Sequence, residues 1–314
     1  MKMVVFRRRW LMVAGCAAAA IAMFGVVSNP AAVGAAATER ALPIYYVQDN
    51  GEKRAALTFD AAWGNEDTEE LIEILGRYDV KATFFLVGQW VDKYPESVKA
   101  LSDAGHEIEN HSSTHPHLPQ CSSEQIRQEL EDCNRKIEAI TGTAPKFHRC
   151  PYGDYDNNAI RTIRSIGMEP IQWNVDSLDW KELTAPEITQ RVMKNVIPGS
   201  IILFHNAAIH TPEALPGIIE ALQKDGYTLC TVSELRAMEQ RFDVAVLLQK
   251  GMIYNEILEQ TGASSATISR VNRALNYGVE GYHQVFARVL GDECVPPTAE
   301  KGRKAGRKKK TEDA

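Results

Sequence analysis

The sequence predicts an α/β protein, with a parallel sheet closed or nearly closed into a (β/α) barrel, followed by a small all-α domain. Between residues 42 and 240, short apolar runs alternate with amphipathic stretches, and strand-helix repeats of this kind form parallel sheets. No GxGxxG motif follows any of the apolar runs, which disfavours a doubly wound dinucleotide-binding fold. After residue 241 the periodicity is that of helices only. We therefore expect two folded domains of different class.

Each predicted strand is a short apolar run between polar or turn residues, and each predicted helix carries apolar residues on one face. The helix at 123–141 has the clearest limits, because serines precede it and Gly142 follows it. In chain order, the barrel elements are expected at 54–59 (strand), 69–78 (helix), 82–87 (strand), 97–103 (helix), 106–110 (strand), 123–141 (helix), 146–149 (strand), 158–165 (helix), 169–173 (strand), 186–196 (helix), 201–204 (strand), 213–224 (helix) and 228–232 (strand). Helices of the second domain are expected at 243–250, 254–261, 265–276 and 281–289.

Charge and composition divide the chain into four predicted regions: 1–41, a signal peptide or signal anchor; 42–240, the barrel; 241–296, the helical domain; and 297–314, a basic disordered tail. The barrel region has 18 Lys and Arg against 31 Asp and Glu, a net charge of −13. A domain with this net negative charge is a poor match for nucleic acid and is compatible with neutral or cationic substrates. The tail includes seven basic residues from Lys301 to Lys310, among Gly and Ala, which is typical of a solvated segment.

The amino terminus has the pattern of an export signal. Lys2 and the run Arg7–Arg9 precede 18 uncharged residues from Trp10 to Val27, and small residues follow. That length suits both a cleaved signal peptide and a retained membrane anchor, so both alternatives stay open. Because basic residues stay on the cytoplasmic side, everything after Val27 is expected outside, at the membrane face or in the cell wall.

Polar residues that directly follow apolar runs are the candidate functional residues, because parallel α/β barrels place their sites at the carboxyl ends of strands. Five segments have this placement: Thr-Phe-Asp-Ala-Ala-Trp-Gly at 58–64, His-Ser-Ser-Thr-His at 111–115, Arg-Cys-Pro-Tyr-Gly at 149–153, Asp-Ser-Leu-Asp-Trp at 176–180 and Ile-Leu-Phe-His at 202–205. In this order and spacing they resemble the five motifs of polysaccharide deacetylases with a NodB-type domain, over about residues 42–236. The resemblance implies a distorted (β/α) barrel that removes acetyl groups from N-acetylated sugars of peptidoglycan, chitin or related polymers. It also implies one divalent metal ion, bound by an aspartate and two histidines.

Amide hydrolysis requires an activated water, an electrophile, donors for the oxyanion and an acid for the leaving amine. His111 and His115 are four residues apart and can direct two imidazoles at one ion, which suits zinc or a similar metal. Two solvent-facing loop histidines are the alternative interpretation of that pair. Together with the other motifs, Asp60 is expected to be the general base and Arg149 its ionic partner.

The remaining motif residues fit the other tasks of the same reaction. His205 is expected to be the general acid, with its pKa adjusted by Asp179. Pro151 and Tyr152 are expected to shape the wall of the site, and the Tyr152 backbone N–H is a candidate oxyanion donor. Trp180 is expected to form an apolar face of the sugar groove, although ordinary core packing is its alternative role.

One position departs from the family pattern. The family usually has two consecutive aspartates after the Phe, a base and a metal ligand, whereas here Asp60 is followed by Ala61. Alanine has no donor atom, so the site loses its anionic ligand and needs water, substrate or a neighbour among residues 65–67 to complete it. The Phe-Asp-x-x-Trp-Gly form resembles a sporulation-associated, PdaB-like branch of carbohydrate esterase family 4. Two interpretations follow: a deacetylase of reduced activity, and a non-catalytic glycan-binding barrel.

Residues 254–271 have the character of a helix-turn-helix. Gly262 supplies the turn between the two helices, and each helix has one apolar face, formed by Ile257 and Leu258 on the first and by Ile268, Val271 and Leu275 on the second. The side chains expected to face DNA are Ser265, Thr267, Ser269, Arg270 and Arg273. An ordinary helical hairpin is the alternative, because an apolar pattern and one glycine do not exclude it.

From about Met238 to Leu290, and above all in the Gly-Ala-Ser run at 262–264 and the Thr-Ile-Ser-Arg-Val-Asn-Arg run at 267–273, the sequence resembles the Trp-repressor-like YerC family. That resemblance implies DNA binding as a dimer. The barrel takes the place of the upstream helices that build the dimer in that family, so we expect little DNA binding by the full-length chain.

The leading hypothesis is an exported, membrane-associated polysaccharide deacetylase with a truncated helix-turn-helix at its carboxyl end. A DNA-binding regulator with a sensor barrel is the second hypothesis, and the export signal and the −13 charge of the barrel oppose it. The non-catalytic glycan-binding barrel is the third.

Overall fold

The computed structural model describes residues 40–47, 52–277, 282 and 286. Residues 43–314 form one unit and residues 1–42 another, of which only the last three residues are described. Residues 1–39 of the predicted signal region and all of the predicted basic tail, 297–314, therefore lie outside the described residues. In the part of the chain that is described, no helix is both long and apolar enough to cross a membrane.

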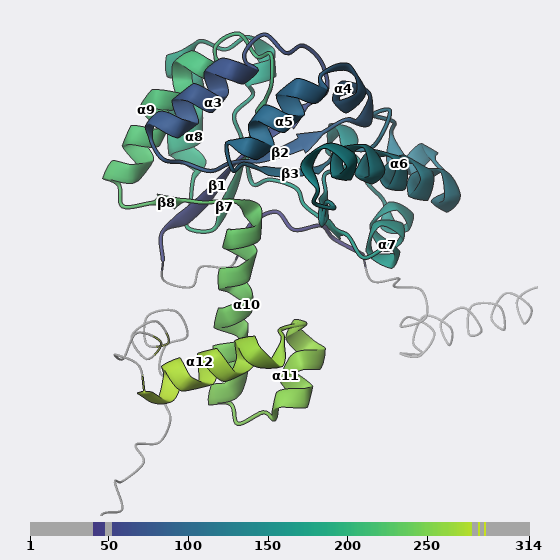
Figure 1. Cartoon of the computed structure of the whole chain (residues 1–314). Helices are drawn as coiled ribbons and strands as arrows, with labels where there is room; N and C mark the ends of the chain where they lie inside the picture. Colours follow the sequence, from purple (N-terminus) through teal and green to yellow (C-terminus); the bar gives the residue numbers. More distant parts are fainter. Residues whose placement is uncertain (1–39, 48–51, 278–281, 283–285, 287–314) are drawn as a thin grey trace, which may run out of the picture. The chain divides into compact units, whose positions relative to one another are not determined.

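One curled parallel sheet is the centre of the first domain (Figure 1). Its strands are β1 (Arg54–Ala61), β2 (Thr83–Leu86), β3 (Glu107–Asn110), β4 (Phe147–His148), β5 (Glu169–Pro170), β6 (Val175–Asp176), β7 (Ser200–His205) and β8 (Thr228–Leu229). They run in the order β5-β4-β3-β2-β1-β7-β6, with β8 paired to β1. No ladder joins β5 to β6 among the described residues; instead, single bridges connect Ile44 to Ile171 and Tyr46 to Ser200. The fold is thus the distorted, incompletely closed barrel that the sequence predicts.

Helices cover the outside of this sheet. They are α3 (Thr68–Arg77), α4 (Gly88–Lys93), α5 (Pro95–Asp103), α6 (Ser123–Thr141), α7 (Asn157–Ser165), α8 (Ala185–Asn195) and α9 (Thr211–Lys224). The limits of α6 match the prediction because a capping box between Ser122 and Gln125 starts it and Gly142, in the left-handed conformation, ends it. The sequence pattern missed α4 and β6, which are too short for a periodicity to register.

Alternation along β1 separates the apolar core from the polar interior. Leu57 and Phe59 belong to the large cluster that also includes buried residues of α3, α8 and α9. Thr58 and Asp60, which alternate with them, are also buried but polar. Because successive side chains of a strand point to opposite faces, the helices pack on one face and the functional groups collect on the other.

The second domain contains α10 (Val232–Gln249), α11 (Tyr254–Thr261) and α12 (Ser265–Tyr277). The helix predicted at 243–250 begins earlier, at Val232, because Thr231 and Glu234 form a capping box there; the strand predicted at 228–232 accordingly ends at Leu229. The apolar cluster of the second domain includes Ile257, Ile268 and Val271, as predicted, whereas Leu258 is exposed. Residues Tyr282 and Phe286 apart, the helix predicted at 281–289 lies outside the described residues.

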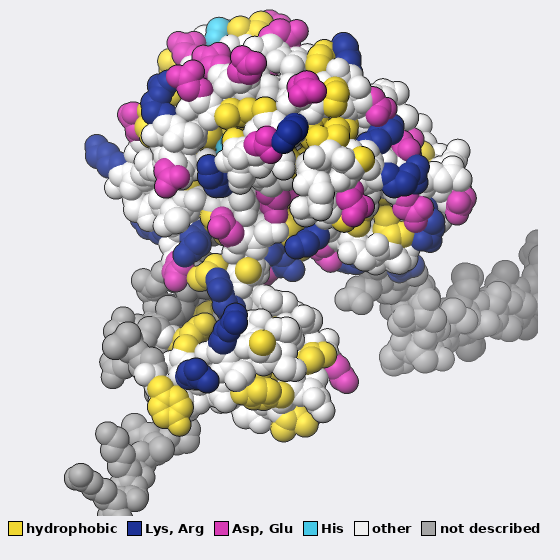
Figure 2. Space-filling view, viewed as in Figure 1, with side chains coloured by type: hydrophobic (Ala, Val, Ile, Leu, Met, Phe, Trp, Pro, Cys, Tyr) yellow, Lys and Arg dark blue, Asp and Glu magenta, His cyan; other side chains and the backbone are white. Residues whose placement is uncertain are grey.

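The visible surface of the barrel is mixed in charge. Figure 2 shows acidic side chains spread over it, interspersed with Lys and Arg, and no face of a single sign. The excess of acids in region 42–240 is thus dispersed on the side shown, which does not build an anion-binding surface there.

Candidate active site

A cavity of 510 Å³ opens at the carboxyl ends of the strands, where the predicted motifs lie. Its lining residues are Asp60, Ala62, Trp63, His111, His115, Tyr152, Gly153, Trp173, Asp176, Trp180, Leu203 and His205. Asp60 of β1 is in register with His205 of β7, and side chains at paired positions of neighbouring strands share a face. The fold therefore brings the predicted base and the predicted acid to adjacent positions of one cavity.

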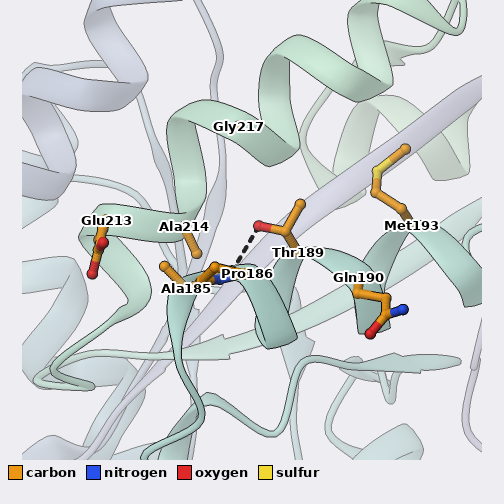
Figure 3. A pocket seen from close by; sticks show the side chains of 8 residues that line it. All are labelled: Ala185, Pro186, Thr189, Gln190, Met193, Glu213, Ala214 and Gly217. Atoms are coloured by element: carbon orange, nitrogen blue, oxygen red, sulfur yellow. Dashed lines mark hydrogen bonds between the residues drawn. The ribbon is translucent and has the colours of Figure 1, made fainter.

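A second hollow lies between α8 and α9 (Figure 3). Of the residues that line it, Glu213 alone is charged, and the others are small, apolar or neutral. Thr189 donates a hydrogen bond to the backbone carbonyl of Ala185 within α8. This hollow holds no pair of groups for acid-base chemistry.

Asp60 and Arg149 form a buried ion pair at the base of the cavity. The Arg149 Nη1 atom lies 2.8 Å from Asp60 Oδ1 and 2.9 Å from Thr58 Oγ1, and its guanidinium stacks on Phe85 with 4.1 Å between the guanidinium carbon and the ring centroid. Burial raises the pKa of Asp60, but the charges of Arg149, His111 and His205 together hold it below its ordinary value. Asp60 is therefore ionised at neutral pH, as a general base must be.

His111 and His115 meet beside that carboxylate. Their Nε2 atoms are 3.2 Å apart, and His111 Nε2 lies 3.6 Å from Asp60 Oδ2. The other ring nitrogen of His111 is 2.7 Å from the Arg149 carbonyl, which fixes the orientation of the imidazole. Burial lowers the pKa of both rings, that of His115 to about 4, so both are neutral at pH 7 and keep a lone pair for a metal.

These two imidazoles fit a transition-metal ion, but a complete set of protein ligands does not form. No group of three metal-binding side chains is present within the described ranges. Ala61 is 1% exposed and packs with the apolar cluster. Asn65, Glu66 and Asp67, considered as substitutes, do not line the cavity; their side-chain oxygens accept hydrogen bonds from Thr68, Asn65 and Ala207 respectively.

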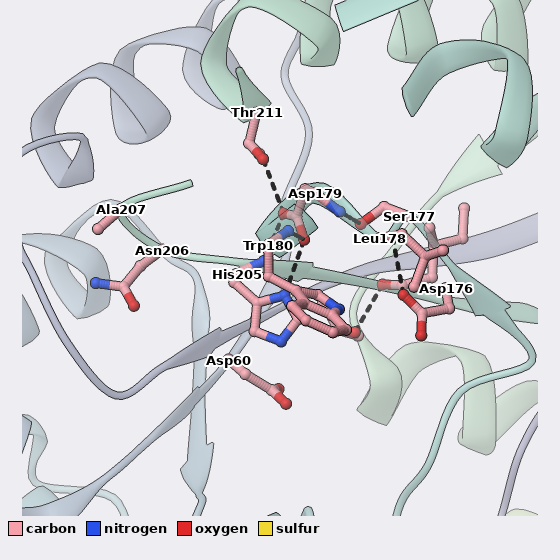
Figure 4. Close-up of polar contacts among 12 residues, drawn as sticks. Asp60, Asp176, Ser177, Leu178, Asp179, Trp180, His205, Asn206, Ala207 and Thr211 are labelled. Atoms are coloured by element: carbon pink, nitrogen blue, oxygen red, sulfur yellow. Dashed lines mark hydrogen bonds and ion pairs between the residues drawn. The ribbon is translucent and has the colours of Figure 1, made fainter. Parts of the chain in front are cut away.

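His205 and Asp179 form the second titratable pair (Figure 4). The His205 Nδ1 atom is 2.8 Å from Asp179 Oδ1, and the His205 backbone N–H donates to Asp179 Oδ2 at 2.8 Å. Thr211, at the start of α9, donates its hydroxyl to the same Oδ2 at 2.8 Å. Burial lowers the pKa of His205, but the hydrogen bond and the charge of Asp179 raise it above its ordinary value. The raised pKa favours the protonated imidazole, the form that a general acid needs.

Aromatic side chains form the walls of the cavity. Tyr152 and Trp180 both line it and are both more than half exposed, which does not fit ordinary core packing for Trp180. Pro151, predicted to shape the wall, is buried and is not among the lining residues. Its fixed φ starts the one-turn helix Pro151–Gly153, whose next residue, Tyr152, has a φ of +60°.

Backbone strain gathers in the loops around the cavity. Non-glycine residues with left-handed φ include Ser112, His115, Tyr152, Leu178 and Ala207, each in or next to a motif segment. Such conformations cost energy and persist where the surrounding structure holds them, often at functional sites. Glycine or asparagine would adopt these backbone conformations with less strain. Because other residues occupy these positions, the surrounding structure must hold their backbone in place.

Sequence reasoning missed three groups of this site: Trp63, Thr211 and Asn206. Trp63 lies within the first motif, so its aromatic character was a usable signal. Thr211 and Asn206 contact residues 32 and 142 or more positions away, and no local pattern predicts such pairs.

The helix-turn-helix residues lie apart from this cavity's lining. Ser265, Ser269, Arg270 and Arg273 are exposed on α12, whereas Thr267 is half-buried and its hydroxyl is 3.0 Å from Ser264 Oγ. Gly262 has a φ of +64° and ends α11, as expected for the turn.

Comparison with known proteins gives two family matches. Residues 47–171 match the family model described as polysaccharide deacetylase, and residues 220–290 match the one described as Trp repressor protein. The chain is 38% identical over 170 residues to a peptidoglycan-N-acetylglucosamine deacetylase of Bacillus cereus, a match that covers 54% of this chain and 60% of the relative. It is 32% identical over 195 residues to the peptidoglycan-N-acetylmuramic acid deacetylase PdaA of Bacillus subtilis, covering 61% and 74% of the two chains.

A solved structure with a similar fold is that of a CE4 family pseudoenzyme from Bacillus anthracis, with a TM-score of 0.60 and 38% identity over 62% of this chain and 69% of that chain. A mutant of that pseudoenzyme with restored enzymatic activity has the same TM-score and 39% identity, over 62% and 71% of the two chains. The chain spans about 60% of the length of the Bacillus cereus relative and about three quarters of PdaA. With the parallel barrel and the five motifs, these matches show that the chain belongs to the polysaccharide deacetylase family.

Proposed function

We propose that the barrel is a hydrolase that removes N-acetyl groups from a cell-wall polysaccharide, peptidoglycan or a chitin-like polymer, with activity reduced by the alanine at position 61. The observation that carries the proposal is the pairing of two titratable groups with opposite tasks in one cavity. Arg149 favours the ionised form of Asp60, and Asp179 raises the pKa of His205 above its ordinary value, which favours the protonated imidazole. Environments that push two pKa values apart are the mark of an acid-base pair.

In this mechanism Asp60 takes a proton from the water that attacks the acetyl carbonyl. Its Oδ2 atom is the one available, since Oδ1 is bound to Arg149. The tetrahedral oxyanion accepts a hydrogen bond from the Tyr152 backbone N–H. His205 then donates its Nε2 proton to the leaving nitrogen, since Nδ1 is bound to Asp179, and acetate and a free amine are the products. Trp180 holds an apolar face of the sugar.

We propose zinc as the metal, bound weakly by His111 and His115. Both rings are neutral and their Nε2 atoms are close enough to share one ion. A divalent ion polarises a carbonyl and lowers the pKa of bound water. Because the described residues supply only two ligands, we assign the ion no step of the reaction.

A non-catalytic glycan-binding barrel is the second candidate, and a specific observation favours it. Ala61 offers no ligand, and a CE4 family pseudoenzyme is among the structures that resemble this chain. In that case the cavity and its aromatic walls bind the sugar, and Asp60 and His205 catalyse no significant deacetylation.

The proposals on export, on sporulation and on the domain limits come from the sequence. We propose export through residues 1–41, with that segment as a cleaved signal or a membrane anchor, and action at the outer face of the membrane or in the wall. The Phe-Asp-x-x-Trp-Gly form supports a sporulation-associated role. We also propose the domain limits 42–240, 241–296 and 297–314, with the qualification that α10 runs through the first of these boundaries without a break.

DNA contact by α12 is a separate proposal, supported by the Trp repressor match and by the exposure of Arg270 and Arg273. Export would carry those residues away from DNA. We expect little or no binding of the full-length chain to mixed duplex; weak binding with a steep salt dependence would indicate only that the basic tail contacts phosphates.

The experiment that tests the proposed activity measures metal content and acetate release from an N-acetylglucosamine oligomer. Activity is expected in the wild type, and Asp60→Asn and His205→Ala should each lower it by about two to four orders of magnitude. Acetate release that survives Asp60→Asn in a folded protein would refute the assigned base. Binding of the oligomer without acetate release would favour the glycan-binding barrel.

A further inference from the structure

Trp63 lines the cavity beside the proposed acid. Trp63 is 51% exposed, close to the 52% of Trp180, so much of its indole is free to contact a ligand. The indole and the His205 imidazole are nearly parallel, with an interplanar angle of 16° and ring centroids 6.0 Å apart. A large apolar surface therefore adjoins the group that must reach the amide nitrogen of the substrate.

The backbone that carries Trp63 is held by side chains from elsewhere in the fold. Asn206 accepts a hydrogen bond from the Ala62 N–H and donates to the carbonyls of Trp63 and Gly64. Trp90 donates its indole N–H to the same Gly64 carbonyl at 2.6 Å. These contacts join the turn after β1 to the segment that follows β7 and to α4.

Glycine at position 64 is required by the same arrangement. Its φ is +60°, and a Cβ atom there would collide with Ala207 and with the Glu66 carboxylate. The turn is thus closely packed around its own backbone while the Trp63 side chain stays exposed. A bulky apolar side chain held out of the core by a rigid turn is a preorganised contact surface.

From these observations we propose that Trp63 is a sugar-stacking residue, which binds the C–H face of a pyranose ring of the glycan next to the scissile acetamido group. The inference rests on the proposed function, because it assumes that a glycan enters this cavity. Ligand cavities are lined by aromatic side chains with a few polar groups that fix orientation, and this one follows that pattern. Trp63 is a specificity-determining residue, since it touches the sugar and no reacting atom.

The test measures the Kd of the full-length chain for N-acetylglucosamine tetramer by isothermal titration calorimetry. Trp63→Ala should raise Kd about three- to tenfold, the range of one aromatic contact, whereas Trp63→Phe should stay within about twofold of the wild type. Tyr46→Ala is the matched control, because Tyr46 is also 51% exposed but does not line the cavity, and its Kd should equal that of the wild type.

The outcomes separate this inference from the proposed function. A folded Trp63→Ala variant that binds the tetramer as tightly as the wild type overturns the stacking role and leaves the deacetylase proposal intact. Absence of tetramer binding by the wild type overturns both. Because Trp63 is exposed, its truncation should leave the thermal midpoint of the barrel nearly unchanged, and circular dichroism checks this.

Discussion

Replacement of Arg149 by methionine isolates the energetic role of the buried ion pair. Methionine keeps an unbranched apolar stem beside Phe85 but removes the guanidinium. The variant loses the 2.8 Å contact to Asp60, the 2.9 Å contact to Thr58 and the 3.2 Å contact to the Gln172 carbonyl. Asp60 is then a carboxylate in a buried site that has lost its main counter-charge.

The expected loss is large because breaking one side of a buried pair costs about 3–5 kcal/mol. In a domain of this size, about 1 kcal/mol shifts Tm by roughly 2–4 °C, so a fall of about 6–20 °C is expected. In the wild type the pKa of Asp60 lies below its unfolded value, so the pair stabilises the fold above that value and loses its effect as pH falls through the folded pKa. In the variant the lowering by Arg149 is lost, so the pKa of Asp60 should rise relative to the wild type and the stabilisation at neutral pH should be lost.

Urea denaturation at pH 7 and near pH 4, followed by tryptophan fluorescence, measures these effects. The difference between wild type and Arg149→Met should shrink at the lower pH, where the unpaired carboxyl is protonated. The double variant Asp60→Asn with Arg149→Met should recover part of the loss at pH 7. A single variant within about 1 kcal/mol of the wild type, or a double variant as unstable as the single one, would refute the reasoning.

Three further predictions concern groups around the barrel. Burial lowers the pKa of His106 to about 4 from an ordinary 6.5, so its contribution to stability, at most about 3 kcal/mol, is present above pH 6.5 and lost as pH falls toward 4; His106→Asn, which keeps an acceptor for the Ala82 N–H, should flatten the acid limb of the stability curve. An unchanged acid limb in that variant would be contrary evidence. Asn206→Ala removes the partner of the Ala62 N–H and of the Trp63 carbonyl and one of the two donors to the Gly64 carbonyl, and it should lower the free energy of unfolding by about 1–3 kcal/mol; no loss in urea titration would show that the turn is held otherwise. Asp179→Asn removes the charge that raises the pKa of His205, so NMR titration should show that pKa below the wild-type value, and an equal or higher one would exclude Asp179 as the cause.

Local signals in the sequence were enough for much of the fold. The limits of α6 match the expected range because a Ser122 capping box starts it and a left-handed glycine ends it, and α11 ends where expected at the left-handed Gly262. The start of α10 was placed eleven residues late, since Val232 and Leu235 pack in a barrel cluster and resemble the end of a strand. Two-residue strands such as β6 exist through pairing with β7 and have no pattern of their own.

In the candidate site, too, some residues could be predicted from the sequence and some contacts could not. Asp60, His111 and His205 follow apolar strands, so the rule for parallel barrels locates them without any structure. The contact of Thr211 with Asp179 and the clamp of Asn206 on the Trp63 turn join distant segments, and only the folded chain reveals them. Pro151 differs from these residues: its place in a motif suggested the cavity wall, but it is buried in the turn and is not among the lining residues, so its role in substrate binding stays a prediction.

The weakened metal site is the central claim, and zinc affinity measured by competition with a chromophoric chelator tests it most directly. We predict weak binding by the wild type, tighter binding by Ala61→Asp of at least about tenfold, and no gain in Ala61→Asn, which matches the aspartate in size but lacks its charge. Acetate release should rise with affinity in the aspartate variant. If Ala61→Asp leaves zinc affinity unchanged while His111→Ala abolishes it, another ligand already completes the site and the claim is wrong.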